Sequence, residues 1–324
     1  MVAFASLNAV ALCIALAWLA RLALPLQQAL RVRNAFLLRR GRAEDFSWTP
    51  AQVPPDFRVE TLPAPAVIRN AVAESGALAV GDDWQRALAL VSMLVRHARR
   101  GGAVRADLST TWREIVAGNG YCADYVRVYL AAASTAGLFC RQWAFSFDGF
   151  GGHGHTFVEV FDRQRSGWVF IDVHNNVYAV AAGSGMPLDA AMLRTALLEA
   201  TPGVEFVRAG EGRLGYEHPH KLMEYFRNGV HEWYLWWGND VVARSETGIA
   251  RLLGRASGRL SHRLAGSLLD VPAMVVWPDE ANEPAIRRMI ALRRQVRVAV
   301  VAVLVPVTML VLLVAWATGR SSDG

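Results

Sequence analysis

A thiol, an imidazole and a carboxylate follow one another in this chain in an order and context that suit covalent catalysis. Cys122 stands in the run Asn-Gly-Tyr-Cys-Ala-Asp-Tyr, His155 opens His-Thr-Phe-Val-Glu-Val, and Asp172 ends Trp-Val-Phe-Ile-Asp. In such a set the thiolate attacks a carbonyl carbon, the imidazole carries the proton, and the carboxylate orients the imidazole. The three residues are a candidate nucleophile, base and orienting group, provided that the fold brings them together.

The cysteine is expected in the first turn of a helix over residues 121–136. Asn119 or Gly120 can cap this helix, and apolar side chains recur from Cys122 onward at helical spacing. The unpaired amide groups and the positive end of the helix dipole favour a thiolate at that position. Asp124 is expected on the solvated face, so that the cysteine points into the protein.

Three strand-like runs follow this helix, over residues 141–147, 155–161 and 167–173. The polar stretch 162–167 predicts a hairpin that pairs Phe161 with Trp168, Glu159 with Phe170, and Phe157 with Asp172. Directly paired residues share a face of the sheet, so His155 and Asp172 become diagonal neighbours within reach of a hydrogen bond. A register slip of one residue places the two side chains on opposite faces.

The stretch from about residue 118 to residue 173 resembles the transglutaminase-like superfamily, whose fold is related to papain-like cysteine proteases. The matching motifs are a cysteine that opens a helix, a strand with arginine, a His-x-Trp-x-Glu strand and a Trp-x-x-x-Asp strand, represented by Cys122, Arg141, His155 with Glu159, and Trp168 with Asp172. The chain departs from the pattern at Phe157, where the family has tryptophan, and at Val173-His174, where it has Pro-Thr. The resemblance implies an α+β fold with a papain/transglutaminase-like core, in which the nucleophile helix packs on an antiparallel sheet.

Further candidates for the substrate loop or for binding the oxyanion are Trp112, Tyr121, Gly152 and His153. Relatives in the family use a tryptophan in the active site, which suggests Trp112, with a core position as the alternative. The glycines of loop 148–155 permit close approach of a substrate, whereas a tight connection between strands is the alternative. His153 competes with His155 for the role of base, and the hairpin register favours His155. No cofactor and no metal site are indicated, because no cysteine or carboxylate cluster completes the histidines.

Both ends of the 324-residue chain carry apolar stretches long enough to cross a bilayer. Residues 3–20 and 298–318 contain no charged side chain, and the first stretch lacks the basic start and cleavage site of a signal peptide. Arginines follow the first stretch and precede the second, which predicts a two-pass protein of the inner (plasma) membrane with its central domain in the cytoplasm. The small number of cysteines agrees with a reducing compartment.

The sequence predicts four segments: a transmembrane helix over 1–25, a basic amphipathic segment and linker over 26–65, a transglutaminase-like domain over 66–290 with core motifs at 118–174, and a transmembrane helix over 296–318. The linker is expected because residues 46–65 are rich in proline. Within the domain, Asp82-Asp83-Trp84 caps a helix that runs to about Arg99. The spacing of Thr111 and Glu114 predicts a capping box for a short helix ahead of the cysteine.

The net charge of +6 does not indicate nucleic-acid binding. Much of the basic excess lies beside the two apolar stretches, where arginine contacts anionic lipid head groups. No helix-turn-helix, RNA-binding signature or phosphate-binding glycine loop is present. The aromatic run over residues 233–237 is interpreted as a core strand, with stacking on sugar rings or contact with lipid as alternatives.

The sequence therefore predicts a membrane-anchored enzyme that transfers acyl groups from amides or esters of a protein or peptide through a thioester on Cys122. Water as acceptor makes it a hydrolase, and an amine makes it a transglutaminase-type transferase. The competing interpretation is a catalytically silent binding or scaffold protein in a membrane assembly, such as one for surface polysaccharide, since a cysteine at a helix start is often a small buried residue. The expected partners are the lipid bilayer and components of a membrane complex.

Overall fold

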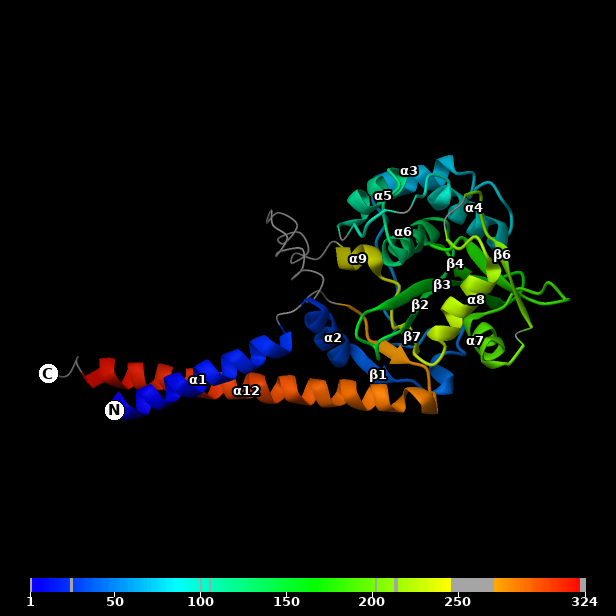
Figure 1. Ribbon diagram of the computed structural model, residues 1–324. Coiled ribbons are helices and arrows are strands. Elements are labelled where there is room, and N and C mark those ends of the chain that lie inside the picture. The colour runs from blue at the N-terminus through cyan, green and yellow to red at the C-terminus, as the bar shows by residue number, and fades with distance from the viewer. Residues whose placement is uncertain are drawn as a thin grey trace. The chain divides into compact units, whose positions relative to one another are not determined.

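The computed structural model describes residues 2–23, 26–99, 101–104, 106–201, 203–212, 215–245 and 271–320, which divide into two compact units. The helical unit contains the described residues within 1–36, 149–152 and 283–324. The sheet unit contains those within 37–148 and 153–282 (Figure 1). The sequence also suggests a last apolar strand or buried turn from Asp270 to Trp277, of which Asp270 lies outside the described residues.

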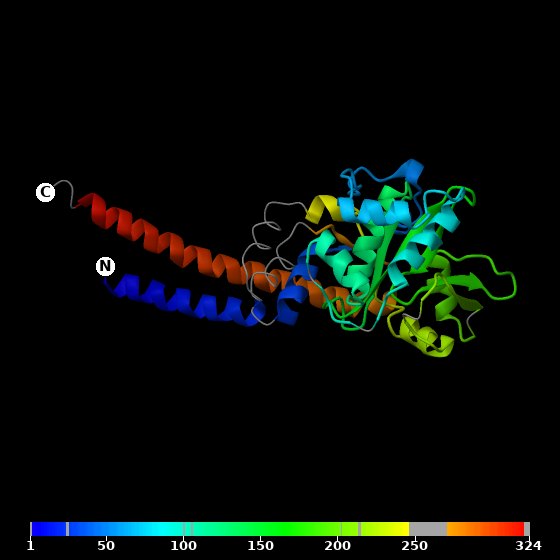
Figure 2. The same cartoon turned by 90° about the horizontal axis from the view of Figure 1, so that it is seen from above.

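Two long helices dominate the helical unit, α1 (Val2–Ala23) and α12 (Glu283–Arg320). The shorter α2 (Leu26–Leu37) follows α1 in the chain. Helices α1 and α12 run antiparallel and side by side (Figures 1 and 2). Their outer faces expose apolar side chains such as Leu7, Ile14 and Leu312. Among the described residues, these two helices are long and apolar enough to cross a membrane, because about 20 apolar residues span the hydrocarbon core.

The glycine loop at residues 149–152 belongs to this helical unit. The side-chain amide of Asn34 on α2 donates to the carbonyl oxygen of Phe150 at 2.9 Å, and both residues are buried. Phe150 has a φ of 67°, a left-handed conformation that is uncommon for a bulky residue. The loop is therefore held by specific packing against α2.

The sheet unit is built on a mixed sheet with strand order β1-β8-β7-β2-β3-β4-β5-β6 among the described residues. The strands are β1 (Leu38–Arg40), β2 (Cys140–Ser146), β3 (Gly154–Asp162), β4 (Gly167–Asp172), β5 (Val177–Ala181), β6 (Val204–Arg208), β7 (Trp233–Trp236) and β8 (Met274–Val276). Strands β1 and β8 are parallel, and the other neighbours in this order are antiparallel. The α+β class is confirmed, but the sheet is mixed where an antiparallel one was expected.

The segment expected to be a linker is part of the sheet unit. It contains the short 3-10 helix Pro50–Gln52, and it follows directly on β1 and a first 3-10 helix, Ala43–Asp45. The side chains of Phe46, Trp48 and Phe57 are buried in the core. Proline disfavours regular helices and strands in this segment, but it does not keep side chains out of the core. The burial of the apolar aromatic side chains therefore makes the segment part of the sheet unit.

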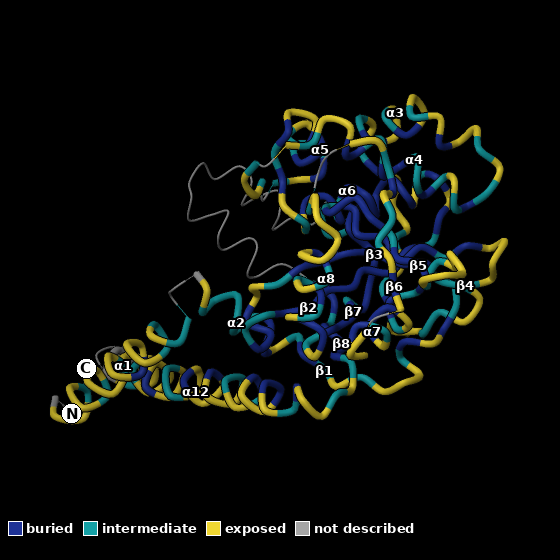
Figure 3. The backbone as a smooth tube through the Cα atoms, turned by 45° about the vertical axis from the view of Figure 1, so that its right-hand side comes forward, coloured by how far each residue is buried: buried dark blue, intermediate teal, exposed yellow. Residues whose placement is uncertain are grey.

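Helices cover both faces of the sheet (Figure 3). The first face carries α3 (Ala66–Glu74), α4 (Asp83–Val95), α5 (Leu108–Val116), α6 (Cys122–Thr135) and α9 (Val241–Ser245), and the second carries α7 (Ala190–Leu198) and α8 (Pro219–Asn228). Side chains alternate between faces along a strand. In β3, Val158 therefore packs in the core of the first face, and Phe157 in the core of the second.

The predicted cap of α4 is present, whereas the predicted cap of α5 is wrong. Asp82 accepts a hydrogen bond from the amide of Gln85 at 2.6 Å, as the predicted cap of α4. Helix α5 starts earlier than expected, at Leu108, because Asp107 is its cap. The Thr111 hydroxyl, expected to cap, lies inside the helix and donates to the carbonyl oxygen of Asp107 at 2.7 Å.

The aromatic run at residues 233–237 is a core strand, as favoured from the sequence. Strand β7 lies between β2 and β8, and Trp233, Leu235 and Trp237 are buried. The run therefore does not form the exposed sugar-stacking or lipid-facing surface that the alternatives required.

Candidate active site

His155 and Asp172 lie at the same end of two neighbouring strands, since β3 begins at Gly154 and β4 ends at Asp172. The predicted hairpin register is present, with Glu159 opposite Phe170. This register puts the imidazole and the carboxylate on one face. The Nε2 atom of His155 and the Oδ2 atom of Asp172 are 2.7 Å apart, and both side chains are buried.

Cys122 is the first residue of α6, and Tyr121 rather than Asn119 or Gly120 is the N-cap. The Asp124 carboxylate accepts hydrogen bonds from the amides of Tyr121 at 2.9 Å and Val104 at 3.1 Å. Asp124 was expected to be solvated, but its side chain is buried because it satisfies these amides. This arrangement fixes the start of the helix, and with it the position of the thiol.

The thiol of Cys122 lies close enough to the His155 imidazole for its hydrogen bonding and charge to act on that ring. Because Asp172 occupies the Nε2 side, Nδ1 is the nitrogen left to exchange a proton with the sulfur. Helix α6 packs on the first face of the sheet, whereas His155 lies opposite Phe145 on the second. The three groups therefore meet at the end of the strands, where the amino end of α6 reaches them.

Asn175 completes the environment of the carboxylate and was missed by sequence reasoning. Its side-chain amide donates to Oδ2 of Asp172 at 2.6 Å, and its backbone amide donates to Oδ1 at 3.0 Å. The spacing Asp-x-x-Asn after a strand is a turn signal that could have identified it. The two hydrogen bonds engage both oxygens of the carboxylate that contacts His155.

The charges of the site favour an imidazolium at neutral pH. Burial by itself disfavours the charged ring of His155, but the charge and hydrogen bond of Asp172, with Cys122 adding to them, raise its pKa to about 10. Burial would raise the pKa of Asp172, yet His155 and Asn175 hold it below its ordinary value.

These two shifts define the pH range in which the pair stabilises the fold. The His155 contribution is fully present below the ordinary pKa of 6.5 and is lost as the pH rises through about 10. The Asp172 contribution is present above the ordinary pKa of 3.8 and is lost as the pH falls below it. The pair is thus most favourable around neutrality.

A second imidazole, His174, lies beside the first without competing for its role. Its ring centroid is 6.1 Å from that of His155 and 5.6 Å from that of Tyr125. Burial and the positive charge of His155 lower the pKa of His174 to about 4, so this ring is neutral. In the described part of the chain, no group of three or more His, Cys, Asp or Glu side chains is arranged to hold a metal ion.

The four residues proposed from the sequence for the substrate loop or the oxyanion site lie in different environments. Trp112 is buried in the core of the first face, which is the alternative given for it. Tyr121 is exposed directly before Cys122. His153 is exposed, with its ring 5.6 Å from that of Phe147, so it does not replace His155 beside the carboxylate. Gly152 belongs to the helical unit, where a Cβ atom would lie 3.4 Å from that of Leu30.

The arginine and glutamate of the family motif form a buried ion pair in the core. Arg141 donates from Nε at 3.0 Å and from an Nη atom at 2.6 Å to the same oxygen of Glu159. Glu159 also accepts from the indole of Trp143 and from the amide of Ala190. The guanidinium lies 3.9 Å from the centre of the Trp168 ring. These residues hold strands and helices together and contact none of the three reacting groups.

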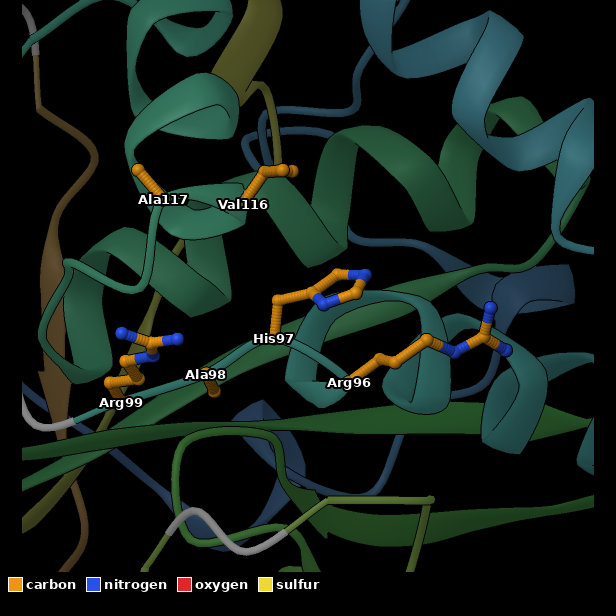
Figure 4. Close-up of a pocket in the computed structure, with 6 residues that line it drawn as sticks. All are labelled: Arg96, His97, Ala98, Arg99, Val116 and Ala117. Atoms are coloured by element: carbon orange, nitrogen blue, oxygen red, sulfur yellow. The ribbon is translucent and has the colours of Figure 1, made fainter.

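One surface hollow of about 320 Å³ has none of Cys122, His155 and Asp172 in its lining (Figure 4). It is lined by Arg96, His97, Ala98, Arg99, Val116 and Ala117, at the carboxyl ends of α4 and α5. Basic side chains are favoured at such ends because they interact with the helix dipole. This explains the charge of the hollow without a ligand.

Comparisons of the chain with protein-family models, with curated proteins and with solved structures found no match.

Proposed function

We propose that this protein is a membrane-anchored, cysteine-dependent acyl-transfer enzyme with a transglutaminase-like core. One observation carries the proposal: a partly exposed thiol at a helix start interacts with a buried imidazole, which a buried carboxylate holds at 2.7 Å. In such an arrangement the carboxylate orients the imidazole, and the imidazole activates the thiol as a nucleophile. Burial of a charged carboxylate or imidazole costs free energy unless the group has a partner. Here Asp172 is paired with His155, and His155 interacts with Cys122.

The mechanism begins from a thiolate and an imidazolium. The Cys122 sulfur attacks the carbonyl carbon of an amide or ester, and the oxyanion that forms accepts a hydrogen bond from the Cys122 amide. Collapse of this intermediate leaves a thioester on the sulfur, and His155 gives its proton to the departing amine or alcohol. His155 then takes a proton from the acceptor, which attacks the thioester and displaces the Cys122 sulfur as the thiolate, so that the starting pair of thiolate and imidazolium is restored. Asp172 orients the ring and stabilises its charge whenever it is protonated.

The nature of the acceptor separates a hydrolase from a transferase. Water is the simpler acceptor, and an amine gives a transglutaminase-type cross-link in a protein or peptide substrate. The alternative function, a silent binding or scaffold protein, would use the aromatic run and the glycine loop to hold a partner. Since Trp233 and Leu235 are fully buried in β7, that run offers no platform for a sugar or another partner. This favours the enzyme.

The two long apolar helices are compatible with a two-pass membrane protein. We further propose the inner (plasma) membrane, with the sheet unit in the cytoplasm, because arginines cluster on the domain side of both helices. Alkaline phosphatase fused to the carboxyl terminus is then expected to be active, and green fluorescent protein fused there to be dark. The reverse pattern would place the sheet unit outside the membrane.

The proposed nucleophile predicts an unusual pH dependence of alkylation. In the full chain in detergent, with Cys13→Ala as background, iodoacetamide is expected to modify Cys122 rapidly at pH 6.5. His155 keeps its proton there, since its pKa is about 10, and its charge favours the thiolate. His155→Ala should slow the reaction about tenfold or more. The measurement is peptide mass spectrometry of the modified thiol over time.

Cys140 provides an internal reference in the same chain. It is buried, and burial raises the pKa of its thiol well above the ordinary range, so it should stay unmodified. If Cys122 reacts at pH 6.5 equally fast with and without His155, the thiol is not activated and the binding protein becomes the better interpretation.

A further inference from the structure

Helix α8 places a tyrosine directly beside the candidate base. The ring centroid of Tyr225 is 5.3 Å from that of His155, at an interplanar angle of 72°. Phe145 and Phe147 contact the same tyrosine ring, with centroids 5.6 and 5.3 Å away. These contacts fix the orientation of the ring, while the side chain remains partly exposed. The phenol is thus a rigid group at the edge of the site.

The hydroxyl of Tyr225 is available as a donor. Within the described residues it makes no hydrogen bond. Burial raises the pKa of the phenol, and negative charge at Cys122 and Asp172 raises it further, so the proton stays on the oxygen. The Tyr225 ring packs against that of the candidate base His155, and the charge of Cys122 also acts on the phenol. A rigid, unpaired O–H beside this imidazole is suited to meet charge that develops when Cys122 attacks a carbonyl group.

We propose that Tyr225 is a catalytic residue that donates a hydrogen bond to the oxyanion of the acyl-transfer reaction, together with the backbone amide of Cys122. This inference rests on the proposed function. It fills a position for which the sequence suggested Trp112, whose side chain packs in the core of the first face instead. Oxyanion sites pair a backbone amide with a second donor, and removal of one donor costs about 10²–10³-fold in rate.

The step in which Tyr225 acts is the attack on the carbonyl group. The lone pair of the Cys122 sulfur forms the new C–S bond, and the π electrons of the C=O bond move to oxygen. The phenol and the amide each donate a hydrogen bond to this oxygen and keep their protons. When the C=O bond re-forms, the bond to the leaving group breaks with its electron pair. An amine then takes the proton of His155, whereas p-nitrophenolate leaves as an anion.

Two reagents separate this role from a structural one. Acylation by p-nitrophenyl acetate passes through an oxyanion, whereas displacement of iodide from iodoacetamide does not. In the full chain in detergent with the Cys13→Ala background, Tyr225→Phe is expected to slow acylation of Cys122 about 100-fold. Alkylation by iodoacetamide should stay within about twofold of the parent, because the substituted ring still packs on His155.

Tyr216→Phe is the matched control, since the Tyr216 ring lies 5.3 Å from that of Tyr225. We expect it to leave both rates unchanged. Equal slowing of acylation and alkylation by Tyr225→Phe would show a structural role and overturn the inference. Unchanged acylation would overturn it as well. A parent protein that resists both reagents would instead refute the proposed function, and the inference with it.

Discussion

Cys122→Ala is expected to abolish acyl transfer by the full chain, with a loss of about 10⁴-fold or more. Without the sulfur no thioester can form, and the remaining groups can only bind the substrate. The side chain is partly exposed at the start of α6, so its removal creates no buried cavity. The melting temperature should therefore change by no more than about 2 °C. Turnover of peptide amides and esters, with intact-mass detection of the thioester, measures the effect.

Cys140→Ala is the informative comparison for this prediction. Cys140 is buried at the start of β2, next to the core of the first face. Its truncation should lower the free energy of unfolding by about 1 kcal/mol and preserve turnover per folded molecule. Cys122→Ala is thus expected to lose turnover and keep its stability, whereas Cys140→Ala is expected to lose some stability and keep its turnover. Full turnover in Cys122→Ala would contradict the nucleophile assignment and favour the scaffold interpretation.

The second large effect is expected on stability, from Glu159→Ala. The substitution leaves the Arg141 guanidinium buried without its counter-charge and removes the acceptor for Trp143 and Ala190. Breaking such a buried pair costs about 3–5 kcal/mol. Since whole proteins have only about 5–15 kcal/mol of stability, the variant should unfold at much lower urea concentration. Tryptophan fluorescence of the full chain in detergent follows the transition.

Two variants control this prediction. The indole and the Ala190 amide donate to different oxygens of Glu159, and Glu159→Gln keeps one of these two acceptors. Its loss of stability should therefore be smaller than that of alanine. Asp56→Ala breaks the largely exposed ion pair with Arg39 and should cost less than about 1 kcal/mol. Equal losses for Glu159→Ala and Asp56→Ala would show that the buried pair does not stabilise the sheet. Turnover per folded molecule should be unchanged in Glu159→Gln, since no reacting group touches this residue.

The pairing of β3 with β4 could be predicted from the sequence alone. Strand alternation has a period of two, and only one register buries the apolar side chains of β3 and β4 while keeping their turn short. The contact between His155 and Asp172 follows from that register, because the residues are close in the chain and local rules govern them. The start and end of α6 are likewise local, set by capping and by apolar periodicity.

The burial of the proline-rich segment could not be inferred by such rules. Phe46 and Trp48 enter the core because the Arg141 side chain, the Trp168 ring and neighbouring strands create a place for them. Those partners are remote in sequence, and burial is a property of the partners as much as of the segment. Proline content reports local conformation only, which is why it suggested a linker.

The sequence by itself determined the helix that starts at Cys122 and the strand register, because each depends on the conformational preferences of neighbouring residues, and it supplied the candidate reacting residues. The tertiary structure decided which of them meet. It brought the amino end of α6 to the end of β3, moved Trp112 into the core, and placed Tyr225 on the imidazole. These contacts join elements that are distant in sequence, and the packing of whole helices fixes them rather than any local pattern.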